Sequence, residues 1–205
     1  MAEGLSVKPV SSITWTDVDG REAALIQRCA ARDEDACAQV VTEHQRMVYQ
    51  LSLNLLGDHN EALDLSQEVF LRVFRTIQRF RGQSALRTWI YRIAVNQARN
   101  RQRWWRRRYK AFQVSLDDHV RDHGELPSTA NGGSPERVYS QKEAAEQLRV
   151  ALDRLPFEQR TALVLREIDE LSYEEIGYSL GIAVGTVKSR LARAREALRG
   201  QLRHV

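Results

Sequence analysis

Apolar residues recur at helical spacing along most of the chain, and no stretch shows the alternation expected of a β-strand. The pattern begins near Arg21 and continues to Leu55, where Gly57 and Asp58 predict the end of a first long helix. The preceding residues 1–19 mix Ser, Thr, Pro and Gly without a period, so they predict a disordered tail. The pattern therefore predicts an all-α protein with a loose N-terminus.

Two further helices are predicted in the N-terminal half. One spans about 60–79. Its apolar face is formed by Val69, Phe70, Val73, Phe74 and Ile77. After a turn at 81–83, Ser84 is predicted as the N-cap of the next helix, which runs to about Arg107. The apolar stripe of this helix fails beyond Asn96, where arginines take over, so its second half is expected to leave the core.

The segment 111–135 holds three glycines and two prolines without a sustained period, which predicts a flexible linker. It separates two predicted small helical domains, 20–110 and 136–205. In the second domain the helical pattern resumes at once, and Pro156 suits the first turn of a further helix. The sequence therefore predicts two domains that a linker joins.

The clearest local signal lies near the C-terminus. Ser172 and Glu175 are spaced as a capping box, which predicts the start of a short helix that ends before Gly181. A second helix is predicted from Val184 to Leu202. Two helices joined by a short turn that contains Gly are typical of a helix-turn-helix.

The last predicted helix has two different faces. Its core face is formed by Val187, Leu191, Ala194 and Leu198. Its outward face carries small residues such as Gly185 and Ser189, with Lys188 beside them and arginines at the sides. Small side chains allow close approach to base edges, and basic ones hold phosphates. The alternative is a plain helical hairpin with a solvated basic face.

Charge is distributed unevenly along the 205 residues, although the formal net charge is only +4. The segment 99–110 carries seven basic residues and no acid, which favours a polyanionic partner. Trp104, Trp105 and Tyr109 are interleaved with these charges and suit base stacking on single strands. Trp89, Asn96 and Asn100 share one helical stripe, and asparagine can hydrogen-bond exposed base edges. The alternatives are a solvated charge run and a Trp89 that belongs to the core.

The helix at 60–79 carries an acidic surface opposite its apolar face. Leu71 lies there among Asp64, Gln67 and Glu68. A leucine ringed by acids is typical of a docking patch for a basic helical partner. Considered alone, the pattern fits an ordinary surface with one stray leucine somewhat better than it fits a docking patch.

Other classes of function find little support. No Gly-rich phosphate loop, nucleophile–base pair or carboxylate cluster stands out, so we expect neither an enzyme nor a cofactor. His119 and His123, with Asp118 and Asp122, form a weak candidate metal site in the linker, so no metal is predicted. The two cysteines, Cys29 and Cys37, are expected to be small buried residues rather than a close metal-ligand pair. No signal peptide or bilayer-spanning run is visible, so a cytoplasmic protein without membrane insertion is expected.

Together these motifs resemble a bacterial sigma factor of the extracytoplasmic-function group, most similar to the sigma-E type. The resemblance covers about 21–202. Its strongest pieces are DLSQEVFLRVFR at 64–75, FRGQSALRTWIYRIAVNQARN at 80–100 and LSYEEIGYSLGIAVGTVKSRLARAREAL at 171–198. It implies that the first domain is sigma region 2 and the second is sigma region 4.

The resemblance also implies partners and residue roles. Region 2 would bind the clamp coiled coil of core RNA polymerase, capture a base of the −10 promoter element in the 80–86 loop and line the melted strand. Region 4 would read duplex DNA at the −35 element, and an anti-sigma factor in a stress or envelope response would control the protein. The implied polymerase-binding residues are Asp64, Gln67, Glu68, Leu71 and Arg75. The implied −10 DNA-binding residues are Phe80, Arg81, Ser84, Trp89, Tyr91, Arg92, Asn96, Arg99, Asn100 and Arg103. The implied −35 DNA-binding residues are Thr186, Lys188, Ser189, Arg190, Arg193 and Arg195.

Three positions depart from the family pattern. Leu63 and Ser66 stand where the family often has an acid and a small aliphatic residue, so the docking patch is less acidic than usual. Ala183 occupies a turn position where Ser or Pro is common. The alternative function is a stand-alone helix-turn-helix regulator that binds duplex DNA without polymerase.

Overall fold

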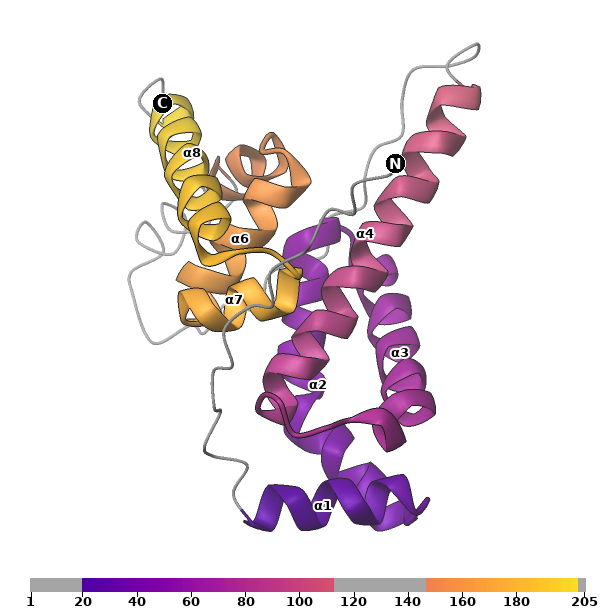
Figure 1. Cartoon of the computed structure of the whole chain (residues 1–205). Coiled ribbons are helices and arrows are strands. Elements are labelled where there is room, and N and C mark those ends of the chain that lie inside the picture. The colour runs from indigo at the N-terminus through magenta and orange to yellow at the C-terminus, as the bar shows by residue number, and fades with distance from the viewer. Residues whose placement is uncertain (1–19, 113–146, 203–205) are drawn as a thin grey trace, which may run out of the picture.

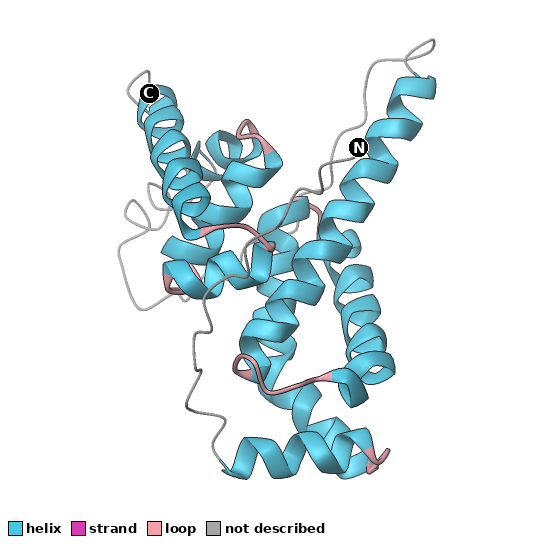
Figure 2. Cartoon of the chain, viewed as in Figure 1, coloured by secondary structure: helices cyan, strands magenta, loops and turns pink. Residues whose placement is uncertain are grey.

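The computed structural model describes residues 20–112 and 147–202, and helices make up all of its regular structure in these ranges (Figures 1 and 2). The helices of the N-terminal unit are α1 (Gly20–Ala30), α2 (Glu34–Leu56), α3 (His59–Thr76), the 3-10 turn η1 (Ile77–Arg79) and α4 (Leu86–Phe112). Those of the C-terminal unit are a helical segment at 147–153, α6 (Phe157–Glu167), α7 (Tyr173–Leu180) and α8 (Val184–Leu202). The all-α prediction is therefore confirmed. The predicted tail and most of the predicted linker lie outside the described residues.

The prediction of one long first helix is wrong, because the chain turns between α1 and α2. Arg32 adopts a left-handed φ of 68° and ends α1. Asp33 then caps α2, where its side chain accepts a hydrogen bond of 2.9 Å from the Ala36 amide. The same carboxylate pairs with Arg28 at 3.0 Å, which holds the turn closed. Because the apolar periodicity continues across this turn, it did not indicate that the helix is interrupted there.

The predicted end of that segment at Gly57 and Asp58 is confirmed. Gly57 takes a φ of 73° after the last turn of α2, a conformation that favours glycine. Asp58 caps α3 by accepting a hydrogen bond of 2.8 Å from the Glu61 amide. The two helices therefore reverse direction over two residues and pack against each other.

Ser84 is not the N-cap of α4, which corrects the prediction made from its residue type. The helix begins at Leu86, whose amide donates a 3.2 Å hydrogen bond to Glu22 Oε1 of α1. Ser84 itself is fully buried, and its hydroxyl finds no hydrogen-bond partner among the described residues. The Glu22 carboxylate of α1 therefore accepts the hydrogen bond that the Ser84 hydroxyl was expected to accept at the start of α4.

The second half of α4 leaves the core, as predicted. Ile90, Ala94 and Ala98 are buried, whereas Arg103 and Trp104 are exposed. Figure 1 shows the last turns of this helix extending away from its neighbours. The basic end of the helix is therefore presented to solvent.

The C-terminal unit contains the predicted helix-turn-helix. Ser172 accepts a hydrogen bond from the Glu175 amide, and the Glu175 carboxylate accepts one of 2.8 Å from the Ser172 amide. Gly181 ends α7 with a φ of 67°. The turn is tight, because a Cβ at Gly177 would lie 3.0 Å from the Ile182 carbonyl oxygen. The capping box and the turn are confirmed.

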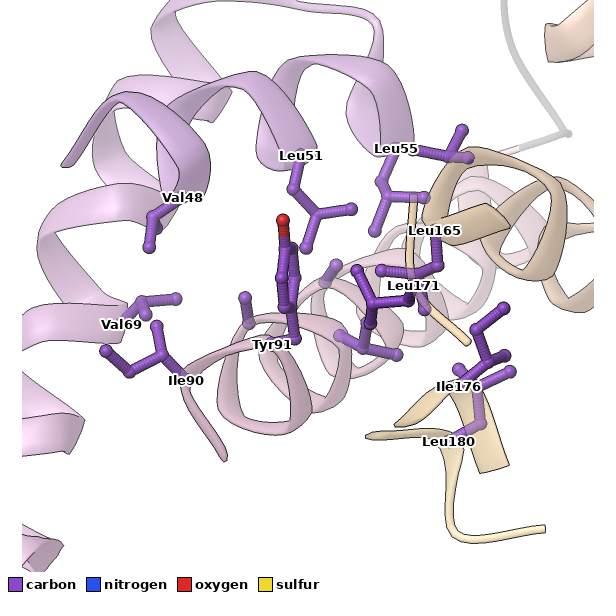
Figure 3. Packing of buried hydrophobic residues seen from close by; sticks show 14 of the residues in the cluster. Val48, Leu51, Leu55, Val69, Ile90, Tyr91, Leu165, Leu171, Ile176 and Leu180 are labelled. Atoms are coloured by element: carbon purple, nitrogen blue, oxygen red, sulfur yellow. The ribbon is translucent and has the colours of Figure 1, made fainter. Parts of the chain in front are cut away.

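The two units pack on each other rather than standing apart. One buried apolar cluster runs through both of them. Figure 3 shows Leu165 and Leu171 of the C-terminal unit beside Leu55 of α2 and Tyr91 of α4. In Figure 1 the C-terminal unit accordingly lies against α4 and α2. None of the helices in the described ranges is long and apolar enough to cross a lipid bilayer.

Candidate polymerase and nucleic-acid interfaces

The predicted polymerase-binding residues lie on one exposed face of α3, which we call the α3 patch. Its members are Asp64, Gln67, Glu68, Leu71 and Arg75, all of them exposed. Leu71 is 54% exposed, although apolar side chains of this size usually pack inside. Arg101 of α4 binds Glu68 at 2.6 Å and Glu61 at 2.7 Å, so part of the acidic charge is already compensated. Nothing in the local pattern of α3 predicted Arg101 as an internal partner.

The loop between η1 and α4 has an aromatic wall. The rings of Phe80 and Trp89 meet edge to face, with centroids 5.3 Å apart, and both side chains are half-buried. Gly82 turns the loop with a φ of 65°, and Arg81 beside it is exposed. Trp89 therefore packs against the core with one part of its ring and reaches the surface with another. The core alternative for Trp89 is therefore confirmed in part, and its DNA role stays a prediction.

A polar stripe follows α4 from this wall. Asn96, Asn100 and Arg103 are exposed and spaced by four and three residues, so they share one face of the helix. Arg92 is exposed at the edge of the stripe, and its guanidinium lies 5.1 Å from the Tyr178 ring centroid of α7. Arg99 is half-buried and binds Glu158 of α6 at 3.0 Å. The structure thus brings the asparagines together at the surface, while the neighbouring arginines contact the C-terminal unit.

The outward face of α8 carries most of the predicted −35 residues. Thr186, Lys188, Ser189 and Arg193 are exposed, while Val187 and its periodic neighbours fill the core. Arg190 lies at the margin and binds Glu158 at 2.6 Å. Arg195 binds Glu167 at 2.6 Å, and this hydrogen bond raises the pKa of the arginine further above its ordinary value.

A polar contact zone between the units, which we call the seam, was not predicted. Tyr91 of α4 is 1% exposed and donates a 2.8 Å hydrogen bond to Asp169 Oδ1, which lies between α6 and α7. Arg87 donates to the Asp169 carbonyl oxygen at 3.2 Å, and Thr88 donates to Glu175 at 3.3 Å. Ser84 and Tyr91 were both predicted to contact DNA, yet both are buried in this arrangement.

The seam perturbs two ionisable groups. Burial raises the pKa of Asp169 to about 6, although the hydrogen bond from Tyr91 and the charge of Arg87 act in the opposite direction. Burial, followed by the Asp169 charge, raises the pKa of Tyr91 above its ordinary value. Desolvation therefore outweighs the favourable partners at this contact.

The candidate metal site at His119 and His123 lies outside the described residues. Among the residues that the structure does describe, no group of three or more His, Cys, Asp or Glu side chains is arranged to hold a metal ion.

Comparison with known proteins matches both units. The family model of sigma-70 region 2 covers residues 40–109, and the model of sigma-70 region 4 covers residues 145–198. The RNA polymerase sigma-H factor of Pseudomonas aeruginosa is 36% identical over 178 residues, which is 87% of this chain and 92% of that protein. The sigma factor SigW of Bacillus subtilis is 37% identical over 87% of this chain and 95% of its own length. The sigma-E factor of Escherichia coli is 35% identical over 86% of this chain and 92% of its own.

Solved structures show the same fold. The sigma factor RpoE from Bartonella quintana, in complex with the anti-sigma factor NepR, superposes with a TM-score of 0.65 and 23% identity, covering 81% of this chain and 96% of that one. CnrH, in complex with the cytosolic domain of CnrY, gives a TM-score of 0.62 at 20% identity, covering 88% of this chain and 96% of that one.

The fold and the two matched regions define a sigma-70-type transcription factor. Within that class, the chain belongs to the extracytoplasmic-function group of RNA polymerase sigma factors. Its function is accordingly that of a sigma factor in transcription initiation, and the stand-alone regulator is not favoured.

Proposed function

We propose that the protein delivers promoter specificity to core RNA polymerase through three of its surfaces. The α3 patch binds the clamp coiled coil, the 80–86 loop with the α4 stripe holds the melted −10 strand, and α8 reads the −35 duplex. The observation that carries this assignment is the α4 stripe, where Asn96 and Asn100 stand exposed next to the Phe80–Trp89 wall. An amide stripe beside an aromatic surface suits unpaired bases, which need both hydrogen bonding and stacking.

Docking on polymerase is supported by the exposed Leu71 within the acidic α3 patch. An apolar side chain surrounded by acids gains burial from contact and orientation from charge. Arg101 keeps two of the neighbouring acids in place, so the patch is rigid before it meets its partner. The proposed partner is a basic helical surface of the enzyme.

The −35 role is supported by the composition of the α8 face. Lys188 and Arg193 are exposed and can hold phosphates, whereas Ser189 and Thr186 are short enough to approach base edges. A single helix-turn-helix of this size gives weak binding by itself. Polymerase fixes the distance between the −10 and −35 surfaces, so both bind as one unit with high effective concentration.

The closed packing of the units must then change when DNA binds. Arg99 of α4 and Arg190 of α8 both bind the single carboxylate of Glu158, so neither is free for a phosphate. The Arg99 pair crosses the seam, as does the contact of Arg92 with Tyr178. We infer that polymerase binding separates the units and releases these arginines to DNA.

An anti-sigma factor is proposed as the negative partner. An apolar groove of about 550 Å³ lies between the 147–153 segment, α6 and α8. Leu148, Ile168 and Leu202 line it and are all more than 40% exposed. An amphipathic helix with apolar residues on one face suits such a groove. The RpoE structure named above contains the anti-sigma factor NepR, which supports the proposal for this chain.

The proposal makes the protein a specificity subunit without covalent chemistry of its own, acting in the cytoplasm where polymerase and promoters meet. The test is in vitro transcription from a promoter library by core RNA polymerase, with and without the full chain. Initiation from a discrete promoter set that depends on the chain supports the proposal. Specific promoter binding by the chain alone, without polymerase-dependent initiation, would overturn it.

A further inference from the structure

The two cysteine side chains touch each other at the turn between α1 and α2. The Sγ atoms of Cys29 and Cys37 are 2.8 Å apart, about 0.8 Å longer than the S–S bond of a disulfide. Each sulfur is carried by a regular helix, and the turn between them is fixed by the Asp33 cap and its ion pair with Arg28. The pair is therefore held in contact by rigid structure rather than by chance.

Neither ordinary packing nor metal binding accounts for this pair. Cys29 is buried with 1% exposure, as the sequence predicted, but Cys37 is half-buried and reaches the surface. A metal site would need further ligands, and within the described ranges no third metal-ligating side chain completes a cluster here. What remains is the chemistry of two thiols in contact, one of which an oxidant can reach.

We propose that Cys29 and Cys37 form a redox modification site, at which hydrogen peroxide converts the two thiols into a reversible intramolecular disulfide. The Cys37 thiolate attacks one peroxide oxygen, which breaks the O–O bond and leaves a sulfenic acid and hydroxide. The Cys29 sulfur then attacks the Cys37 sulfur, the S–S bond forms, and the sulfenic oxygen leaves as water with the proton from Cys29. Two thiols and one peroxide thus become one disulfide and two waters.

The environment of the pair assigns the order of these steps. Burial raises the pKa of Cys29 to about 12, with a further contribution from its hydrogen bond to Cys37, so its thiolate is scarce at neutral pH. Cys37 is nearer to solvent and therefore meets the oxidant first. Cys29 acts as the resolving cysteine, since its sulfur already lies against its partner.

The disulfide would fasten α1 to α2, and α1 forms hydrogen bonds near both ends of the 80–86 loop. The Ala30 carbonyl oxygen accepts a 3.1 Å hydrogen bond from Gln78 of η1. Glu22 of α1 accepts one from the Leu86 amide where α4 begins. Tying α1 down therefore stabilises the N-terminal unit around that loop. This inference does not depend on the proposed DNA-binding roles.

The test uses the reduced full chain treated with hydrogen peroxide. The chain contains two cysteines in all, so an intramolecular disulfide can join only this pair. We expect both free thiols to disappear, the intact mass to fall by about 2 Da, and dithiothreitol to reverse both changes. The matched variant Cys29→Ser should instead gain oxygen at Cys37. Oxygen addition to both cysteines of the natural chain, a disulfide between two chains, or unchanged thiols would overturn the proposal.

A second measurement tests the stabilising role. We expect the oxidised chain to unfold at a temperature several degrees above that of the reduced chain, because a short cross-link restricts the unfolded state. Peroxide should leave the unfolding temperature of Cys29→Ser without such a rise. A disulfide that forms but lowers the unfolding temperature would refute the stabilising role and leave the modification site standing.

Discussion

Glu158 is the residue at which the closed arrangement can be perturbed most cleanly. The variant Glu158→Gln keeps the size of the side chain but removes the charge that holds Arg99 at 3.0 Å and Arg190 at 2.6 Å. The Arg99 pair crosses the seam, whereas the Arg190 pair lies within the C-terminal unit. The substitution should therefore weaken the packing of the two units and, separately, release an arginine of the recognition helix.

The size of the effect follows from exposure. The Glu158 side chain is 39% exposed and that of Arg99 is 20% exposed, so water screens the pair partly. A pair of this kind contributes about 0.5–1 kcal/mol. Since about 1.4 kcal/mol corresponds to a tenfold change, the seam should open about two- to fivefold more often in the variant. The buried contact between Tyr91 and Asp169 remains, so the units should still pack for most of the time.

Hydrogen–deuterium exchange of the peptides that carry Tyr91 and Asp169 measures this opening directly. Glu167→Gln is the matched control, because it also removes one acid and releases one arginine, Arg195, but within the C-terminal unit alone. We expect exchange at the seam to be faster in Glu158→Gln than in the natural chain, and to be unchanged in the control. In the absence of polymerase, Glu158→Gln should also bind promoter DNA more tightly than the control. Equal exchange and equal binding in the two variants would refute the role of the Arg99 pair.

Three further outcomes follow from the structure. Asn96→Ala should slow promoter opening, measured by permanganate reactivity of the melted strand, while polymerase binding stays within about twofold; an equal loss in both assays contradicts the strand-binding role. Leu71→Asp should weaken polymerase binding about tenfold or more without lowering the unfolding temperature, because Leu71 is exposed; a large fall in that temperature would mean that the side chain supports the fold instead. The raised pKa of Asp169, about 6 against an ordinary value of 3.8, means that the folded protein holds this proton more tightly than the unfolded chain. The contribution of Asp169 to stability is therefore greatest below about pH 4 and falls as pH rises to about 6. Asp169→Asn should therefore reduce the pH dependence of the free energy of unfolding between about pH 4 and pH 6, measured by denaturant unfolding at each pH. An unchanged pH dependence contradicts the assignment.

Sequence reasoning succeeded where a structural rule is local. The capping box at Ser172 and Glu175, the left-handed Gly57 and the change of face along α4 are each decided by residues within one or two turns. Exposure of Leu71 and Asn96 could be predicted for the same reason, since the opposite face of each helix fills the core. The functional roles of these exposed residues stay predictions, because surface position alone does not identify a partner.

The errors arose where segments distant in sequence meet. Ser84 has the residue type of an N-cap, but the Leu86 amide donates its hydrogen bond to Glu22, which is 64 positions away in the sequence. The resemblance implied that Tyr91 binds −10 DNA, and it gave no sign that this side chain is buried and hydrogen-bonded to Asp169, 78 positions later. Glu158 carried no signal at all, because an acid in the first turn of a helix is ordinary. Contacts between the two units cannot be derived from the periodicity of either one.

If Arg99 and Arg190 bind DNA as proposed, DNA competes directly with their ion pairs to Glu158. The Glu158 carboxylate binds both Arg99 and Arg190, so one negative charge is shared between two positive charges. Successive phosphates offer each of them a separate anion, and the displaced counterions add to the gain. Salt weakens both kinds of contact, so high ionic strength loosens the seam without producing DNA binding. Release of the arginines becomes productive only when polymerase holds the separated units at the spacing of the two promoter elements. We therefore propose that closure limits nonspecific DNA binding by the free protein and costs the sigma factor little once polymerase holds it.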